Sequence, residues 1–281
     1  MKKNNILTVL RIAAALAVWF LVYKLYGAFI DPMLEGKLSE TIRMIISHML
    51  VPYTVGLGAF YLIVMGMPVP EKTKSSVSVG NNDIHDTKKI LSTGFMLKAF
   101  LVQMGISMPV MMIFNIIFKI LGLPVPGMTE DELFGVHMIF YIVLLLIFNP
   151  VMEEVLFRKL VLDRLLILGE VPAIIISSIM FGLPHLYSQG LPHMFSTFAI
   201  GLVWAYVRVK TGKLWPCMGL HMMFNLYGCY FALFMAQRPV TVFLIFLLNM
   251  MVLPAAAALF LVFEFKQPKY QRKIVSNVAY K

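Results

Sequence analysis

Long apolar segments dominate this 281-residue chain and limit what it can fold into. A helix needs about 20 consecutive, mainly apolar residues to cross a bilayer. The hydrophobic content is 60%, above the roughly 45–50% that is typical of soluble proteins. We therefore predict an all-α polytopic membrane protein of about eight transmembrane helices, near residues 7–29, 42–66, 93–120, 134–152, 171–187, 192–209, 214–236 and 240–264.

The basic residues indicate how these helices are oriented. Cytoplasmic loops of membrane proteins carry an excess of Lys and Arg. With the N-terminus inside, most basic residues between helices fall on the cytoplasmic side, and the opposite side keeps little beyond Lys37, Arg43 and Arg238. An even number of helices with both termini in the cytoplasm fits this asymmetry. The net charge of +10 then belongs to helix ends beside membrane lipids, and we expect no nucleic-acid partner.

One long polar stretch divides the chain. It is rich in Pro, Ser, Gly and Asn, a composition typical of a loop. We expect an N-terminal transmembrane hairpin at residues 1–66, a polar cytoplasmic loop at 67–92, a catalytic transmembrane bundle at 93–264 with its motif core at 145–236, and a basic C-terminal tail at 265–281. No internal repeat is visible, which disfavours an inverted-repeat transporter.

Two adjacent carboxylates and a guanidinium follow the fourth apolar run. Glu154 and Arg158 are four residues apart, so on a helix they share a face and can form an ion pair. Glu153 lies about 100° away around the helix and is left free. An unpaired carboxylate in a partly dry site suits general acid–base catalysis, although a structural charge network at a helix end is the simpler explanation. Pro150 removes a backbone donor one turn earlier and loosens the helix.

Two further polar motifs lie in later apolar runs. His185 ends the run Phe181–His185, where a lone histidine is commonly a packed, hydrogen-bonded residue, but where it could also help Glu153 to deprotonate a water. His221 and Asn225 are four residues apart and share a helical face. Both can donate hydrogen bonds to an oxyanion, an interaction of about 3–4 kcal/mol per well-placed donor. An ordinary interhelical hydrogen bond is the alternative for this pair.

Taken in order, EEVLFR (153–158), FGLPH (181–185) and HMMFN (221–225) resemble the motifs EExxxR, FxxxH and HxxxN of the CPBP intramembrane proteases. That family includes the CAAX prenyl endopeptidases of the Ras-converting type and bacterial proteins linked to bacteriocin processing and self-immunity. The resemblance covers roughly residues 145–236.

The resemblance implies a role for each motif residue. Glu153 and His185 would activate the hydrolytic water, His221 and Asn225 would bind the oxyanion, and the Glu154–Arg158 ion pair would support the site. It further implies a multi-pass protein, which we expect in a bacterial cell membrane, acting on a membrane-associated protein or peptide that is either a prenylated CAAX protein or a leader-bearing one.

A metal-dependent version of this site uses the same residues. Zinc binds carboxylates and imidazoles, so Glu153, His185 and His221 are the alternative ligands. We expect no cofactor, because Arg158 neutralises Glu154 and a cation beside a divalent metal is unfavourable.

Two other classes of function compete with an intramembrane endopeptidase. A non-catalytic immunity or scaffold protein would use the polar cluster for stability or partner binding. A transporter would use the carboxylates as a proton relay, but the polar groups converge on one site and do not form a chain across the membrane. The other histidines, His48, His85, His137 and His193, lie outside the three motifs, and His193 is a suitable control for His185.

Overall fold

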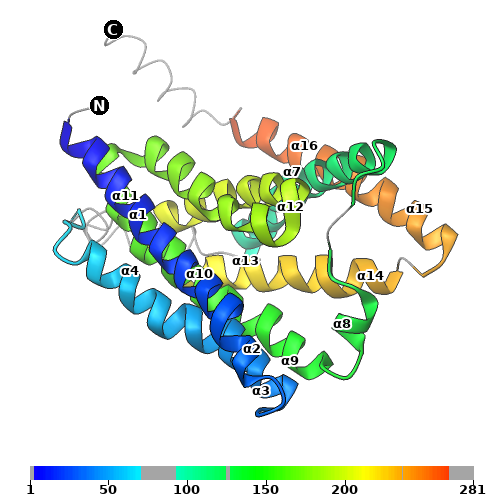
Figure 1. Ribbon diagram of the computed structural model, residues 1–281. Coiled ribbons are helices and arrows are strands. Elements are labelled where there is room, and N and C mark those ends of the chain that lie inside the picture. The colour runs from blue at the N-terminus through cyan, green and yellow to red at the C-terminus, as the bar shows by residue number, and fades with distance from the viewer. Residues whose placement is uncertain (1–2, 71–92, 125–126, 236, 266–281) are drawn as a thin grey trace, which may run out of the picture.

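The computed structural model describes residues 3–70, 93–124, 127–235 and 237–265. Every regular element in these ranges is a helix (Figure 1), so the prediction of an all-α chain is confirmed. Two expected segments lie outside the described part: residues 71–92 of the polar loop, which include His85, and residues 266–281 of the tail.

Short π-helical turns connect many of the α-helices. The first half of the chain contains α1 (Lys3–Leu25), a π-turn (Tyr26–Ile30), α2 (Asp31–Leu34), α3 (Glu40–Ile45), a π-segment (Ile46–Gly56), α4 (Leu57–Val64), α7 (Thr93–Ile120), α8 (Glu130–Phe134), α9 (Met138–Val143), a π-turn (Leu144–Phe148), α10 (Asn149–Glu154) and a π-segment (Val155–Leu162). The rest contains α11 (Asp163–Leu165), a 3₁₀ turn (Leu166–Leu168), α12 (Glu170–Thr211), α13 (Trp215–Asn225), a π-turn (Leu226–Phe231), α14 (Ala232–Met235), α15 (Pro239–Leu247), a π-turn (Leu248–Val252) and α16 (Leu253–Phe265).

Seven helical segments of the described ranges are long and apolar enough to cross a membrane: Asn5–Leu34, Glu40–Val64, Thr93–Ile120, Met138–Leu168, Glu170–Thr211, Trp215–Met235 and Pro239–Val262. Large apolar side chains such as Leu7, Leu62 and Ile120 are more than 60% exposed on the outside of these segments. Exposed apolar side chains of this size on membrane-length helices are compatible with lipid rather than water. The chain is therefore an integral membrane protein.

The prediction of about eight helices differs from these seven segments because of α12. The two expected helices at 171–187 and 192–209 are the two legs of this one 42-residue element, which bends at Gly190. Gly190 has φ 76° and ψ −178°, a conformation that is essentially restricted to glycine. The bend turns α12 into a hairpin whose legs lie side by side.

Small residues let the two legs approach closely. A Cβ atom on Gly182 would lie 2.9 Å from the Met194 carbonyl oxygen, and one on Gly201 would lie 3.2 Å from the Ser178 Cβ. The hairpin holds Phe181 and His185 on its first leg and Trp204 on its second. It packs against α7, against the 155–162 segment and against α13, so it occupies the centre of the fold.

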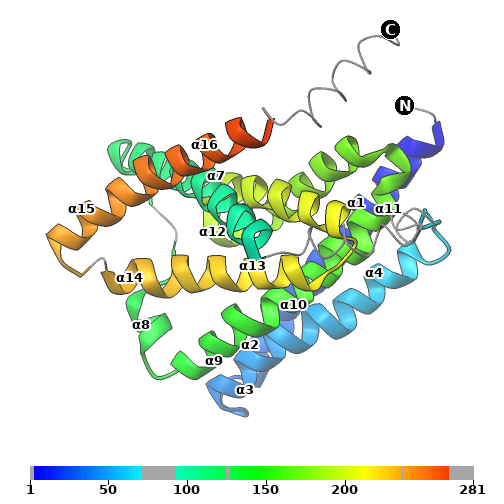
Figure 2. The same ribbon diagram turned by 180° about the vertical axis from the view of Figure 1, so that it is seen from behind.

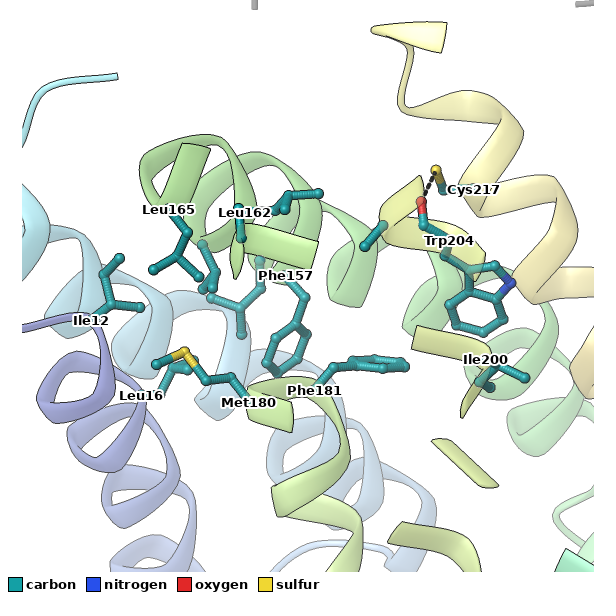
Figure 3. Packing of buried hydrophobic residues seen from close by; sticks show 14 of the residues in the cluster. Ile12, Leu16, Phe157, Leu162, Leu165, Met180, Phe181, Ile200, Trp204 and Cys217 are labelled. Atoms are coloured by element: carbon teal, nitrogen blue, oxygen red, sulfur yellow. Dashed lines mark hydrogen bonds between the residues drawn. The ribbon is translucent and has the colours of Figure 1, made fainter. Parts of the chain in front are cut away.

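The buried core joins the N-terminal helices to the rest of the bundle. Helix α1 packs along α4 and the 46–56 segment. Its Trp19 ring meets Phe157 edge-on at 6.2 Å between centroids, and Figure 3 shows Phe157 and Phe181 between Ile12 and Leu16 on one side and Trp204 on the other. The first described residues of α1 and the last of α16 both lie at the upper edge of the bundle in Figures 1 and 2.

Candidate active site

The first motif lies where α10 passes into the 155–162 segment. Glu153 and Glu154 are the last residues of α10, and Arg158 lies in the π-helical segment that follows. The Arg158 Nε atom donates a hydrogen bond to Glu154 Oε2 at 3.0 Å, and both side chains are fully buried. The spacing of four residues alone predicts this ion pair. Because both side chains are buried, solvent does not reach it.

His221 on α13 brings the third motif to the same carboxylates. Its Nδ1 atom lies 3.2 Å from Glu154 Oε1, and its Nε2 atom lies 3.9 Å from Glu153 Oε2. A carboxylate accepts hydrogen bonds, so Nδ1 carries the proton that it donates to Glu154. Glu154 therefore accepts from two donors, Arg158 and His221.

The Glu153 carboxylate is in a different situation from its neighbour. Its side chain is 14% exposed, and the His221 Nε2 atom lies 3.9 Å from its Oε2 atom. At 3.9 Å this contact is too long to be a hydrogen bond, and no hydrogen bond from the described residues reaches the carboxylate. Glu153 is thus close to the cluster while its oxygens remain available.

His185 on the first leg of α12 borders this cluster through Phe181. Its Nδ1 atom donates to the Phe181 carbonyl oxygen at 3.1 Å, so in a neutral ring Nε2 is the free acceptor. The Phe181 ring lies 5.5 Å from the His185 ring and 6.2 Å from the His221 ring. Among the described residues no hydrogen bond or ion pair joins His185 directly to Glu153.

Asn225 occupies a backbone site in this structure. Its Nδ2 atom donates to the Leu145 carbonyl oxygen at 2.8 Å. The cause lies in the π-turn before α10: the Asn149 N–H binds the Leu144 carbonyl, and the next donor in that register would belong to Pro150, which has no N–H. Asn225 satisfies the carbonyl that Pro150 leaves without a partner, and its second amide N–H remains for another acceptor.

The sequence analysis did not identify the aromatic side chains that pack against His221 and Arg158. The Trp204 ring stacks on His221 with centroids 4.3 Å apart and planes 26° apart. The Arg158 guanidinium lies 4.6 Å from the centre of the Phe181 ring, and its two terminal nitrogens are buried with no hydrogen-bond partner among the residues that the structure describes. A cation over an aromatic face gains about 2 kcal/mol or more when it is desolvated. Trp204 lies in an apolar run and belongs to none of the three motifs, so nothing in the sequence distinguishes it from an ordinary core residue.

The remaining histidines that the structure describes make their hydrogen bonds and ion pairs with groups outside the cluster. His137 is 3.3 Å from Glu40 on another helix. His48 contacts Ser47 and a backbone carbonyl. His193 donates to the Gln189 carbonyl at 3.1 Å, the same local bond that His185 makes on the other leg of α12.

The fit of a metal to the site can be tested on the same contacts. Both oxygens of Glu154 are engaged, Nδ1 of His221 faces Glu154, and Nδ1 of His185 faces its own helix. In the ranges that the structure describes, no group of three or more His, Cys, Asp or Glu side chains is arranged to hold a metal. The alternative zinc ligands Glu153, His185 and His221 do not form a metal site as they are arranged.

Fold and site together define a polytopic helical membrane protein with a buried carboxylate–histidine cluster at the crossing of α10, α12 and α13. Residues 135–227 match the family described as Type II CAAX prenyl endopeptidase Rce1-like. This segment contains all three motifs, and the match confirms the resemblance to the CPBP and CAAX proteases. It implies a protease that acts on a membrane-associated protein. No curated protein and no solved structure matches the chain.

Proposed function

We propose that this protein is an intramembrane endopeptidase that uses a glutamate-activated water to hydrolyse a peptide bond of a membrane-associated substrate. One observation carries the proposal: residues from two distant motifs, Glu154 with Arg158 and His221, meet in one buried cluster beside Glu153. Buried ionisable groups within a membrane segment are costly and commonly mark function.

Glu153 is the proposed general base. Its carboxylate takes a proton from the water, and the water oxygen forms a bond to the scissile carbonyl carbon. His185, whose Nε2 is free, orients the water or shares its proton. The carbon–nitrogen bond then breaks, and the leaving amine receives the proton that Glu153 had taken. A positioned base of this kind contributes about 10²–10⁴-fold to the rate.

His221 and Asn225 are the proposed oxyanion donors. His221 can donate through Nε2 while Nδ1 remains bonded to Glu154 only when both ring nitrogens are protonated. The two carboxylates, the guanidinium and this imidazolium then sum to zero charge, so that the cluster carries no net charge into the membrane. Asn225 would contribute the amide N–H that Leu145 does not use.

The substrate and the location belong to the same proposal. A prenylated CAAX protein or a leader-bearing peptide presents its scissile bond at a membrane surface, and this suits a site inside a helical bundle. We propose a bacterial cell membrane as its location. The proposal involves no metal. The Arg158 Nε atom lies 3.0 Å from Glu154 Oε2, and its positive charge would repel a divalent cation bound at the neighbouring residues.

The test is cleavage by purified protein in detergent or liposomes, first on CAAX peptides with and without a prenyl group and then on candidates found by comparing membrane proteomes. Glu153→Gln keeps the shape of the side chain and removes the base, so we expect a loss of at least about 100-fold. His185→Ala should lose activity as well, whereas His193→Ala removes an identical histidine–carbonyl bond and should not.

An unchanged rate in folded Glu153→Gln protein would refute the assigned role. If no substrate is cleaved and the substitutions only lower stability, a non-catalytic immunity or scaffold protein becomes the better hypothesis.

A further inference from the structure

Helix α7 contributes a buried polar residue to the site although it lies outside the family match. Gln103 is fully buried in an apolar helix, where an amide without hydrogen-bond partners is unfavourable. Its Oε1 atom accepts a hydrogen bond from Trp204 Nε1 at 2.6 Å, and its Nε2 atom donates to the Leu220 carbonyl at 3.1 Å. Both ends of the amide are therefore committed, which fixes its orientation.

Both partners of Gln103 lead directly to His221. Leu220 precedes His221 on α13, so the bond to its carbonyl holds the backbone that carries the imidazole. Trp204 stacks its ring on the imidazole itself, 4.3 Å between centroids. The Trp204 backbone carbonyl also accepts a hydrogen bond from Cys217 Sγ at 3.3 Å (Figure 3), which ties the second leg of α12 directly to α13.

We propose that Gln103 and Trp204 are positioning residues that hold the His221 ring in its active orientation, an inference that rests on the proposed function. A histidine ring can turn about its χ2 bond, and the Glu154 bond at Nδ1 fixes only one point of it. Stacking on Trp204 fixes the plane of the ring, and Gln103 fixes Trp204. A misplacement of about 1 Å in such a group can cost roughly 10²-fold in rate.

Two variants test this role against a matched control. Gln103→Leu removes both amide bonds, and Trp204→Phe keeps an aromatic ring but removes the indole donor. Trp19→Phe is the control, because Trp19 is also buried and donates its indole N–H, to the Pro52 carbonyl at 2.8 Å, without touching His221. We expect kcat to fall about 10–100-fold with KM unchanged in the first two variants. The control should lose comparable thermal stability and keep its kcat.

Tryptophan emission provides a readout that needs no activity. An imidazole stacked on an indole quenches its fluorescence, so His221→Leu should raise the emission of otherwise unchanged protein. The increase should disappear in the Trp204→Phe background and shrink in the Gln103→Leu background.

The outcomes separate the two proposals. An unchanged kcat in Gln103→Leu, an equal fall of kcat in Trp19→Phe, or an emission increase that is the same with and without Gln103 would overturn the positioning role. A chain that cleaves no substrate while the emission changes occur as expected would overturn the proposed function and leave the role of Gln103 in holding His221 standing.

Discussion

Arg158 provides the sharpest test of how the site is built. Its ion pair with Glu154 is fully excluded from solvent. Breaking a buried pair by removing one partner costs about 3–5 kcal/mol, because it leaves an uncompensated buried charge. We therefore expect Arg158→Met to lower the free energy of unfolding by that amount, with His221 the one remaining donor to Glu154 in the cluster.

The double variant Glu154→Gln/Arg158→Met should recover most of this loss. The amide introduced at position 154 would keep an acceptor oxygen for His221, and neither charge of the pair would remain. The two terminal nitrogens of Arg158 have no hydrogen-bond partner in the described part of the chain. Each such buried donor costs about 1–3 kcal/mol, so their removal also favours the double variant. Replacing a buried pair by uncharged groups is often neutral or stabilising by about 1–4 kcal/mol.

The measurement is reversible unfolding in mixed micelles by titration with a denaturing detergent. Lys210→Met is the control, because Lys210 and Glu170 form an ion pair at 3.6 Å that is largely exposed, and such pairs contribute about 1 kcal/mol or less. The reasoning fails if Arg158→Met unfolds within about 1 kcal/mol of the unmodified protein, or if the double variant is no more stable than the single one.

Three further predictions use other parts of the fold. Gly190→Ala should lower the unfolding free energy by about 1–3 kcal/mol, because Gly190 has a backbone conformation that is essentially restricted to glycine. Gly219→Ala should raise it by about 0.5–1 kcal/mol in the same titration, since a Cβ atom at Gly219 would meet none of the described atoms within 4 Å. Asn225→Leu leaves the Leu145 carbonyl without its donor and should cost about 1–3 kcal/mol in the same assay; a neutral effect would mean that water replaces the amide. Purified active protein should contain substoichiometric zinc by elemental analysis and should keep its rate in chelators, and stoichiometric metal whose removal abolishes cleavage would contradict a metal-free mechanism.

The local parts of the site could be predicted from the sequence because they depend on helical spacing. Glu154 and Arg158 are neighbours on any helix at that separation, and the expected transmembrane segments follow from their apolar runs. The two legs of α12 were also expected, as separate helices. What the sequence did not indicate was that Gly190 joins them in a tight hairpin, since a glycine between two apolar runs is equally compatible with an ordinary loop.

The non-local contacts could not be predicted in this way. Gln103 reaches Trp204 across 101 positions of the chain, and no periodicity links residues that far apart. A lone glutamine within an apolar helix was nevertheless a usable signal, because a buried amide needs a partner. The contact between Asn225 and Leu145 depends on a shift from α- to π-register before Pro150, and propensities do not reveal the position of such a shift.

The different roles proposed for Glu153 and Glu154 follow from the hydrogen bonds that each carboxylate accepts. Adjacent residues on a helix point about 100° apart, and here Arg158 and His221 both direct donors at Glu154. Glu154 is thereby committed to holding these two side chains together, and it cannot turn to a water without releasing one of them. Glu153 accepts no hydrogen bond from the described residues and is the more exposed of the two. The contacts that occupy the Glu154 carboxylate therefore leave the Glu153 carboxylate as the group that can exchange a proton. This difference between the two glutamates connects the ion pair of Glu154 to the chemistry proposed beside α13.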